Sequence, residues 1–584
     1  MRPVPCAQLS RARRRSRLVH AVLFVLASLL IPVSVAAAAE RVEEPFASAS
    51  PQADVTQSLV KIKVPLPART AAHPEACDWL QYVRWRSADG PAKSADADSV
   101  VVLMPGILEG AMAFDVLARN SIREAARRGR HIEVWGLDRR ANCLEDLTGV
   151  KAYGRTGNLD DLLGYYWRGK TVDGRTFDGF DRNNRVLKDI GMAQTVNDVY
   201  AVMTNETPSQ AWREQHLVCG GHSLGGPIFQ IFGGWDFDGD RRTNDDAGYR
   251  QCAGFVGFES TLDLDPTTDA KWLQGLIATV FLGRRDAART AGYAAIKAGL
   301  IPARADIGGA DPRSALFMEA VAADASRNPG GDATALLRGM PYSKTMYDYF
   351  HTVGSASLNK MLFTKDSIRQ YRYTNMGLLG QLLDDNGAPF SAVRASFGFF
   401  DGAPVRRNLL PGQLCQVPVL CWAFQPNQMF LPAYPTRTTP LMGWKNYDQV
   451  GGKGQPGEGS TSPQSEVTDA NDLARLLHEG PTNFMEPYMP TRIVTDLTSW
   501  YGGDRFGDLS HFFYNHPLRN KPRMESLGGS GVANKAKLGS PDPFVMNPGY
   551  EHVDSITAAE RQNNGKPEGS TKVVVDMVDA VVPR

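Results

Sequence analysis

The residues with the clearest chemical meaning form the run Gly221-His-Ser-Leu-Gly225, a G-x-S-x-G motif around Ser223. The motif follows a short apolar segment and precedes an apolar run, residues 227–232, that can form a helix. Glycine on both sides permits a turn so sharp that bulkier residues would collide with neighbouring backbone. Such a turn presents the serine hydroxyl beside the N–H groups that begin the helix, which favour developing negative charge. The pattern therefore predicts that Ser223 is the nucleophile of an acyl-transfer reaction.

Four segments together resemble the α/β-hydrolase family. They are similar to its oxyanion loop after the third strand, its nucleophile elbow, its sixth strand and its histidine-bearing loop. In that order, the segments are residues 103–106, 221–225, 254–260 and 549–554. The resemblance covers residues 77–260 and 518–584, and it implies a Ser–His–acid triad at the carboxyl edge of a mostly parallel, doubly wound sheet.

A serine hydroxyl is a poor nucleophile near neutral pH, so the reaction needs a general base. The histidines that follow Ser223 in the chain are His351, His478, His511, His516 and His552. The family order places the base near the chain end, and only His552 follows a candidate strand, residues 543–547, and precedes a terminal helix. His552 is therefore the predicted base, and His516 is the next candidate.

The triad carboxylate orients the imidazole and stabilises the imidazolium that forms during the reaction. At the usual family position, after the seventh strand, segment 522–531 has Gly and Ser in place of an acid. Some family members carry the acid after the sixth strand, where this sequence has Glu259, so Glu259 is the predicted acid. The alternatives are Asp263, Asp265, Glu525 and Asp448.

The tetrahedral intermediate of acyl transfer also needs N–H donors for its oxyanion. By resemblance, these are the main-chain N–H groups of Leu224 and Ile107, with Leu108 as the alternative to Ile107. The loop reads Pro105-Gly106 where the family often has His-Gly, a change that is compatible with donors from the main chain.

A separate acidic motif, Asp236-Phe-Asp-Gly-Asp240, follows the helix predicted after Ser223, and Asn244-Asp-Asp246 comes next. Alternating carboxylates with a glycine turn suit a hard cation, so Asp236, Asp238 and Asp240 are candidate ligands of a structural calcium ion. The pattern differs from an EF-hand because Gly239 is at the fourth position and no Glu occupies the twelfth. An acidic surface turn is the alternative interpretation.

Several strands and helices must position these groups. Residues 79–85 alternate as a half-buried strand, whereas residues 100–104 form the continuous apolar run of a strand buried on both faces. A helical pattern over 113–128 and a strand over 132–137 follow. This alternation predicts an α/β fold with a mostly parallel sheet and crossover helices.

We expect a large, mainly helical cap between strands six and seven. The predicted divisions of the chain are 1–39 signal peptide, 40–76 leader, 77–265 first part of the core, 266–518 cap and 519–584 second part of the core. Within the cap, residues 272–282 and 288–300 read as helices. The stretch 340–373 is dense in Met and aromatic residues, which either line an apolar cleft or form the core of the cap.

The N-terminal residues have the pattern of a cleaved signal peptide. Basic residues at 11–17 precede an apolar stretch, 21–35, and a small-residue run, Ala37-Ala-Ala39. The apolar stretch contains Pro32 and is shorter than the roughly 20 residues of a membrane-spanning helix. We therefore expect a secreted or periplasmic protein without a stable membrane anchor.

Six cysteines remain after the predicted cleavage, and in an oxidising compartment an even number indicates disulfides. Six cysteines allow 15 connectivities. Cys415 and Cys421 are close enough in sequence to close a small loop and are the pair that we predict.

The chain of 584 residues has 64 Lys and Arg against 63 Asp and Glu, a net charge of +1 that gives no overall attraction to nucleic acid. It has no G-x-G-x-x-G after a strand and no H-E-x-x-H, so we expect no required cofactor. The expected activity is cleavage of a small-molecule or lipid-like carboxylic ester, or less directly of an amide or lactone, by an exported serine hydrolase. An acyltransferase with the same triad and a catalytically inactive binding protein of the same fold are the alternatives.

Overall fold

The computed structural model describes most of the chain after the predicted signal peptide. The described residues are 39–181, 184–262, 287–306, 311–341, 343–421, 423–425, 427–434, 440–501, 509–533, 543–563, 565 and 567–583. The predicted signal peptide up to residue 38, the helix expected over 272–282, and the alternative acids Asp263 and Asp265 lie outside these residues.

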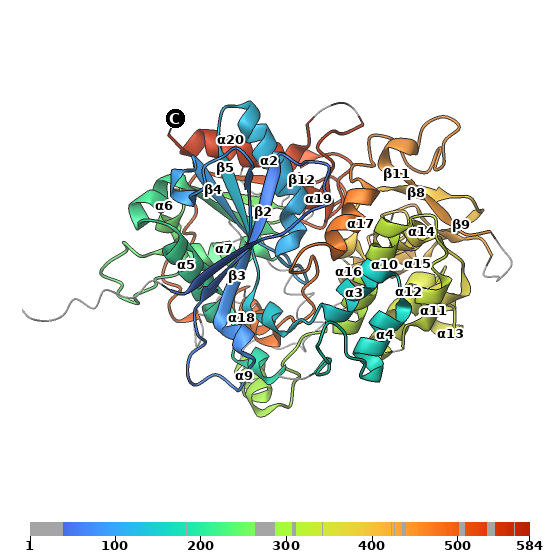
Figure 1. Cartoon of the computed structure of the whole chain (residues 1–584), viewed down its shortest axis with the longest axis horizontal. Coiled ribbons are helices and arrows are strands. Elements are labelled where there is room, and N and C mark those ends of the chain that lie inside the picture. Colours follow the sequence, from blue (N-terminus) through green and yellow to red (C-terminus); the bar gives the residue numbers. More distant parts are fainter. Residues whose placement is uncertain are drawn as a thin grey trace, which may run out of the picture. The chain divides into compact units, whose positions relative to one another are not determined.

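A nine-stranded sheet runs through the protein in the order β1-β2-β3-β5-β4-β6-β7-β12-β13 (Figure 1). The first three strands and β5 pair antiparallel, and all pairs from β5 to β13 are parallel. The strands are β1 (Arg41–Pro45), β2 (Val55–Lys63), β3 (Trp79–Ser87), β4 (Ser99–Met104), β5 (Ile132–Leu137), β6 (Leu217–His222), β7 (Gly254–Phe258), β12 (Arg523–Gly528) and β13 (Phe544–Asn547). The predicted mostly parallel sheet is thus confirmed.

The central parallel strands are buried along their whole length. Every residue of β4, β5, β6 and β7 is buried, as expected for parallel strands covered on both faces. The strands predicted over 79–85, 100–104, 132–137 and 543–547 correspond to β3, β4, β5 and β13. For β4 and β5 the hydrophobic pattern was sufficient because burial on both faces leaves little room for polar residues, whereas β3 and β13 are partly exposed.

Helices cover both faces of the sheet. Tyr82 and Trp85 are three residues apart in β3 and so point to opposite faces. Tyr82 donates a hydrogen bond of 2.6 Å to Glu206 of α5 (Met192–Glu206). Trp85 Nε1 donates one of 2.8 Å to Asp115 of α2 (Asp115–Arg127). The terminal helix α20 (Gly569–Val581) packs beside α2, and α7 (Gly225–Gly233) packs beside α5, so the sheet is doubly wound.

The chain between β7 and β12 forms a second group of elements, most of which lies to one side of the sheet (Figure 1). Its helices are α9 (Ala287–Ala298), α10 (Pro312–Arg327), α11 (Thr334–Gly339), α12 (Lys344–Gly354), α13 (Leu358–Phe363), α14 (Asn375–Leu383), α15 (Leu410–Leu414), α16 (Pro418–Cys421), α17 (Ala470–His478) and α18 (Thr491–Tyr501). Its strands form two antiparallel pairs, β8 (Gly398–Asp401) with β11 (Gly443–Asn446) and β9 (Val405–Asn408) with β10 (Met429–Pro432).

Two helices that precede Ser223 join this second group. The helices α3 (Thr148–Thr156) and α4 (Leu159–Arg168) pack together, and α3 packs against α10. The predicted boundary at residue 266 assigns both helices to the core part of the chain, so the predicted division does not follow their packing. The helix expected over 288–300 is present as α9.

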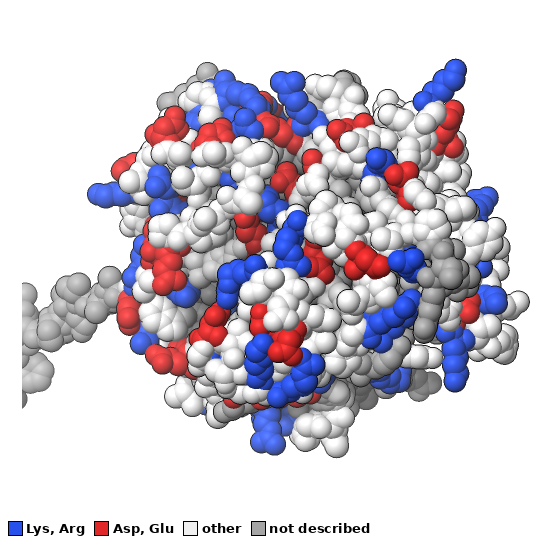
Figure 2. Space-filling model, turned by 45° about the vertical axis from the view of Figure 1, so that its right-hand side comes forward, with Lys and Arg blue, Asp and Glu red and all other residues white. Residues whose placement is uncertain are grey.

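The hydrophobic core is continuous between the sheet and the second group, and residues 41–584 form one compact unit. The Met and aromatic stretch contributes to this core rather than to an open cleft. Its Met and aromatic residues exposed by 1% or less are Met340, Met346, Phe350, Tyr371 and Tyr373, whereas Tyr347 and Phe363 are exposed. On the face of the molecule seen in Figure 2, basic and acidic side chains are interspersed, and neither sign dominates.

Three disulfides link the six cysteines as Cys77–Cys143, Cys219–Cys252 and Cys415–Cys421. The predicted pair, Cys415–Cys421, is confirmed. Cys219 lies in β6, so its disulfide fastens the strand before Ser223 to the residue that precedes β7 by two positions. Within the part of the chain that the structure describes, no helix combines the length and apolarity needed to cross a bilayer.

Candidate active site

Ser223 occupies a strained turn between β6 and α7. Its φ is 49°, in the left-handed region that non-glycine residues seldom adopt, and its N–H donates to Phe258 O at 3.0 Å. The flanking glycines are required because a Cβ on either Gly221 or Gly225 would collide with the carbonyl oxygen of Met104 at the end of β4. The predicted strand–serine–helix turn is therefore present, and close packing against β4 explains its glycines.

The loop after β4 lies directly against this turn. A Cβ on Gly106 would stand 3.0 Å from the Cβ of Ser223. The Gly106 N–H donates to Glu109 Oε2 at 2.7 Å, so it is not available to an oxyanion. Among the described residues, none accepts a hydrogen bond from the N–H of Ile107, Leu108 or Leu224. The N–H groups of both predicted oxyanion donors, and of the alternative Leu108, are therefore not used by other described residues.

His552 and Glu259 meet at the same edge of the sheet. His552 follows β13, and Glu259 directly follows β7 with a φ of 43°. His552 Nδ1 lies 3.1 Å from Glu259 Oε2, and both side chains are almost wholly buried. No hydrogen bond joins the Ser223 hydroxyl to the His552 ring. The structure thus brings the predicted base and the predicted acid into direct contact.

The loop after β12 encloses the Glu259 carboxylate. Gly528 N donates to Oε1 at 2.7 Å, and Ala533 N donates to Oε2 at 3.0 Å. A Cβ on Gly531 would collide with all three atoms of the carboxylate group. This loop occupies the usual family position of the acid, and its Gly and Ser residues leave space for an acid that comes from the neighbouring strand. The loop after β12 therefore surrounds the carboxylate of the predicted acid, Glu259, instead of carrying an acid of its own.

Burial is the largest effect on the His552 ring, and it lowers the pKa of His552 below its ordinary value of 6.5. The neighbouring His222 ring lowers the pKa further, whereas the hydrogen bond that His552 donates to Glu259 opposes the shift. A lowered pKa keeps the imidazole neutral near pH 7, which is the form that can accept a proton.

The other candidate acids and histidines lie elsewhere. Glu525 on β12 accepts from Leu262 N at 2.8 Å, and Asp448 is exposed in a turn of the second group. His516, the second candidate base, lies before β12 with a φ of 49°, and no contact with Ser223 or Glu259 is seen. The structure therefore favours His552 over His516 by position.

Two residues of this region were not singled out from the sequence. His222 Nδ1 lies 2.7 Å from Glu109 Oε2, and His222 Nε2 lies 3.0 Å from the main-chain oxygen of His552. The rings of His222 and His552 have their centroids 4.6 Å apart. His222 is the variable residue inside the G-x-S-x-G motif, and Glu109 is the first acid after Pro105-Gly106. These two positions in the sequence are the features from which His222 and Glu109 could have been predicted.

In the acidic motif after α7, the carboxylates that lie close together are not the three that were predicted as ligands. Carboxylate oxygens of Asp236, Asp238 and Asp246 all lie within 4.8 Å of one another. Asp240 is not part of this cluster because its carboxylate pairs with Arg242 at 2.6 Å. Asp246 therefore takes the place expected for Asp240, and calcium binding stays a prediction.

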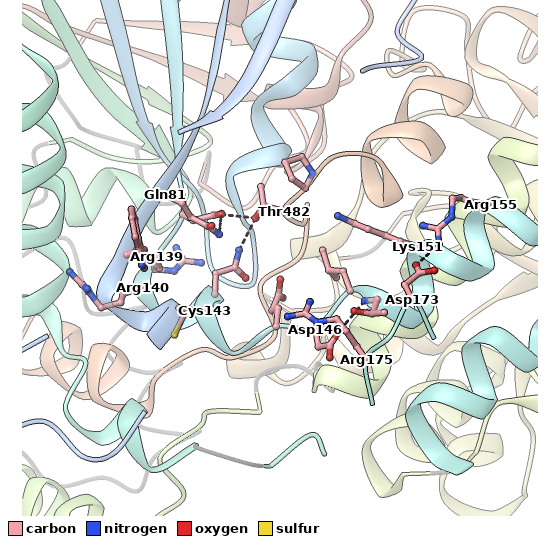
Figure 3. Close-up of a pocket in the computed structure, with 18 residues that line it drawn as sticks. Gln81, Arg139, Arg140, Cys143, Asp146, Lys151, Arg155, Asp173, Arg175 and Thr482 are labelled. Carbon is pink, nitrogen blue, oxygen red and sulfur yellow. Dashed lines mark hydrogen bonds and ion pairs between the residues drawn. The ribbon is translucent and has the colours of Figure 1, made fainter. Parts of the chain in front are cut away.

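A cavity of about 420 Å³ lies between the sheet and α3. Figure 3 shows Gln81, Arg139 and Arg140 on one side of it and Lys151 and Arg155 of α3 on the other. Ser223 and His552 are not among its lining residues. Arg139 connects the two sites, because its guanidinium donates to the carbonyl oxygens of Pro105, Gly106 and Glu109 at 2.7–2.9 Å. The wall of this cavity is polar, and one of its residues holds the loop beside Ser223.

The doubly wound parallel sheet, the left-handed Ser223 between strand and helix, and the histidine after the last strand define the fold as that of the α/β-hydrolases. No protein-family model and no curated protein sequence matches the chain.

Three solved structures that the chain matches share 10% sequence identity with it. The peroxisomal α/β-hydrolase Lpx1 from Saccharomyces cerevisiae gives a TM-score of 0.28, with 93% of this chain and 88% of that chain covered. The juvenile hormone epoxide hydrolase from the silkworm Bombyx mori gives 0.30, and an enantioselective mutant of the Aspergillus niger epoxide hydrolase gives 0.28; each covers 90% of this chain and 78% of its own.

Proposed function

We propose that the protein is a serine hydrolase that cleaves a carboxylic ester through an acyl-enzyme on Ser223. The observation that carries the proposal is the 3.1 Å contact between His552 Nδ1 and Glu259 Oε2 at the sheet edge that also bears the Ser223 turn. Because the Nδ1–H of His552 donates to the carboxylate, Nε2 holds the lone pair that accepts the serine proton. Ser223 is then the nucleophile, His552 the general base and Glu259 the acid that orients it.

In the first half of the reaction, Ser223 Oγ attacks the ester carbonyl carbon while His552 Nε2 takes the hydroxyl proton. The N–H groups of Leu224 and of Ile107 or Leu108 stabilise the oxyanion. His552 returns the proton to the departing alcohol. In the second half, His552 deprotonates a water molecule, which attacks the acyl-enzyme and releases the acid and Ser223.

Two of the similar structures are named as epoxide hydrolases, and such enzymes use an aspartate nucleophile. This chain has Ser223 at the turn, which favours acyl transfer over epoxide opening. An acyltransferase would use the same groups and differ only in excluding water from the acyl-enzyme. A binding protein without activity would need neither the lowered pKa of His552 nor unpaired N–H groups beside Ser223.

We further propose that the protein acts outside the cytoplasm, because residues 1–39 have the pattern of a signal peptide and the six remaining cysteines form disulfides. The substrate is a small-molecule or lipid-like ester. The polar cavity that Arg139 links to the oxyanion loop favours an ester that carries a polar part.

The test is labelling of the mature protein with a fluorophosphonate probe, which reports an activated serine without knowledge of the substrate. We expect labelling that is absent from Ser223→Ala. A folded wild-type protein that stays unlabelled would contradict the proposal. If labelling occurs, hydrolysis of an ester series with analysis of the products separates a hydrolase from an acyltransferase, because only the former releases the free acid when alcohol acceptors are present.

A further inference from the structure

A second glutamate–histidine pair lies directly behind the candidate triad. His222 is fully buried, and Glu109 is 6% exposed. Glu109 Oε2 accepts from Gly106 N–H at 2.7 Å and contacts His222 Nδ1 at 2.7 Å. On the other side of the ring, His222 Nε2 contacts the main-chain oxygen of His552 at 3.0 Å. One buried imidazole therefore connects the oxyanion loop to the loop that carries the base.

The partners of the two ring nitrogens indicate the protonation state of His222. The carbonyl oxygen of His552 can only accept, so Nε2 must carry a hydrogen. Glu109 Oε2 already accepts the Gly106 N–H, which favours a carboxylate, so Nδ1 carries a hydrogen as well. His222 is then an imidazolium paired with an ionised Glu109.

Burial opposes both charges, but their mutual attraction outweighs it. Burial lowers the pKa of His222, and the charge and hydrogen bond of Glu109 more than reverse this, so the pKa is raised. In the same way, burial raises the pKa of Glu109, and His222 then lowers it below the ordinary value. Both directions agree with an ion pair at neutral pH.

We propose that Glu109 and His222 are positioning residues of the active site. The pair fixes Gly106 and the main chain of His552 in one hydrogen-bonded chain, and the charge of His222 helps to keep the His552 ring in its neutral, proton-accepting form. This inference rests on the proposed function, because it assigns a task to groups that serve Ser223 and His552.

The charge of His222 acts on His552 against the charges of two glutamates, Glu109 and Glu259, which favour the imidazolium form of His552. A further ion pair, between Arg139 and Glu486, lies at the loop that carries Glu109. Arg139 donates to the main chain of the oxyanion loop and pairs with Glu486 at 2.6 Å. With His222 neutral, Glu109 and Glu259 would face the His552 ring without the nearest opposing charge, so the imidazolium form of His552 would gain stability.

The test uses His222→Gln, whose amide can still donate a hydrogen bond but carries no charge. The measurement is the rate of fluorophosphonate labelling of Ser223 as a function of pH, which needs no known substrate. We expect the acidic limb of the profile to move to higher pH by about one unit in His222→Gln, because a charge ~5 Å away is removed. His351→Gln is the matched control: both ring nitrogens of His351 also contact main-chain oxygens, but in α12. It should keep the wild-type limb.

Glu109→Gln provides the second variant, since it removes the partner of His222 and weakens the contact with Gly106 N–H. We expect slower labelling at the alkaline plateau, about tenfold or more, as the oxyanion loop loses its fixed position. Thermal unfolding of each variant shows whether it is folded.

A folded His222→Gln with an unchanged acidic limb overturns the assignment of the charge, and a folded Glu109→Gln with an unchanged plateau overturns the assignment of the position. If neither His222→Gln nor Glu109→Gln folds, the proposal also fails, because the pair would then support the fold as a whole. These outcomes differ from failure of the proposed function, in which the wild type itself is not labelled.

Discussion

His222 and His552 are two buried histidines whose rings lie 4.6 Å apart, and each contacts a glutamate through Nδ1. Their pKa values nevertheless shift in opposite directions, raised for His222 and lowered for His552. At His222 the charge and hydrogen bond of Glu109 outweigh burial, whereas at His552 burial and the charge of His222 prevail. The second ring nitrogens differ as well. His222 Nε2 contacts a carbonyl oxygen, whereas His552 Nε2 has no hydrogen-bond partner among the described residues. A second acceptor fixes one imidazole as a cation, and its absence leaves the other free to exchange a proton.

The carboxylates differ as well. Glu109 belongs to the oxyanion loop, and Glu259 reaches His552 from the end of β7 and is held by two N–H groups of the loop after β12. Neither glutamate alone determines what its histidine does. Two glutamate–histidine pairs therefore have different proposed roles. Glu109 and His222 hold two loops in position, whereas Glu259 and His552 act together to accept a proton.

The largest expected effect is on kcat/KM, where alanine substitutions of the two histidines should give very different losses. His552→Ala should lower kcat/KM for a cleaved ester by ~10⁴-fold or more, because the substitution removes the proposed general base. His222→Ala should lower it by about 10–100-fold, since the base itself remains. Steady-state kinetics of the two variants measure the contrast, and equal losses would contradict the division of roles.

Glu259→Gln should come next, with a loss in kcat of ~10³–10⁴-fold, because a neutral amide does not stabilise the imidazolium and favours the wrong tautomer. Glu525→Gln is the control, since that carboxylate is buried on the adjacent strand and bonds Leu262 N rather than a histidine. If Glu525→Gln lost as much activity as Glu259→Gln while both remained folded, Glu259 would not be the triad acid.

A smaller effect should follow from Gly531→Ala, which adds one methyl group against the Glu259 carboxylate. The displaced carboxylate should reduce kcat by about 10–100-fold, as expected for a misplaced orienting group. Gly529→Ala is a matched control in the same loop, because its Cβ would meet nothing closer than the Cα of Pro548 at 3.4 Å. Activity of Gly531→Ala equal to that of Gly529→Ala would show that the enclosure is not required.

The smallest expected effect is on the dependence of kcat/KM on pH in the acidic range. Because burial and His222 lower the pKa of His552, the neutral base should persist below pH 6.5, its ordinary value, and be lost only as the pH falls through the lower folded-state value. The kcat/KM profile of the wild type should therefore have its acidic midpoint below pH 6.5. A midpoint above that value would mean that the glutamates outweigh His222 at this ring.

Much of this arrangement could be read from the sequence, because its signals are local. The glycines around Ser223, the apolar strands β4 and β5, and the position of His552 after the last strand each follow from a short run of residues. Glu259 could also be predicted from the sequence, because the segment around β12 has no acid at the usual position and few other positions could supply the triad carboxylate.

Other features depend on contacts that no short window of sequence contains. The Glu109–His222 pair joins residues separated by 113 positions, and neither belongs to the predicted triad. The helices α3 and α4 pack with a region that follows them by more than a hundred residues. Asp240 looked equivalent to its neighbours in the acidic motif, but Arg242 two residues later captures its carboxylate and leaves Asp246 in the cluster. Which side chains pair in such cases depends on which partners the folded chain brings close together.

The enclosure of Glu259 also bears on synthesis. Glu259 bonds to Gly528, 269 residues later in the chain, and to His552, 293 residues later. In the proposed mechanism, a growing polypeptide therefore has neither the base nor a fixed acid until residues 528 and 552 have been synthesised. The proposed activity would then arise late in synthesis, although Ser223 is made much earlier.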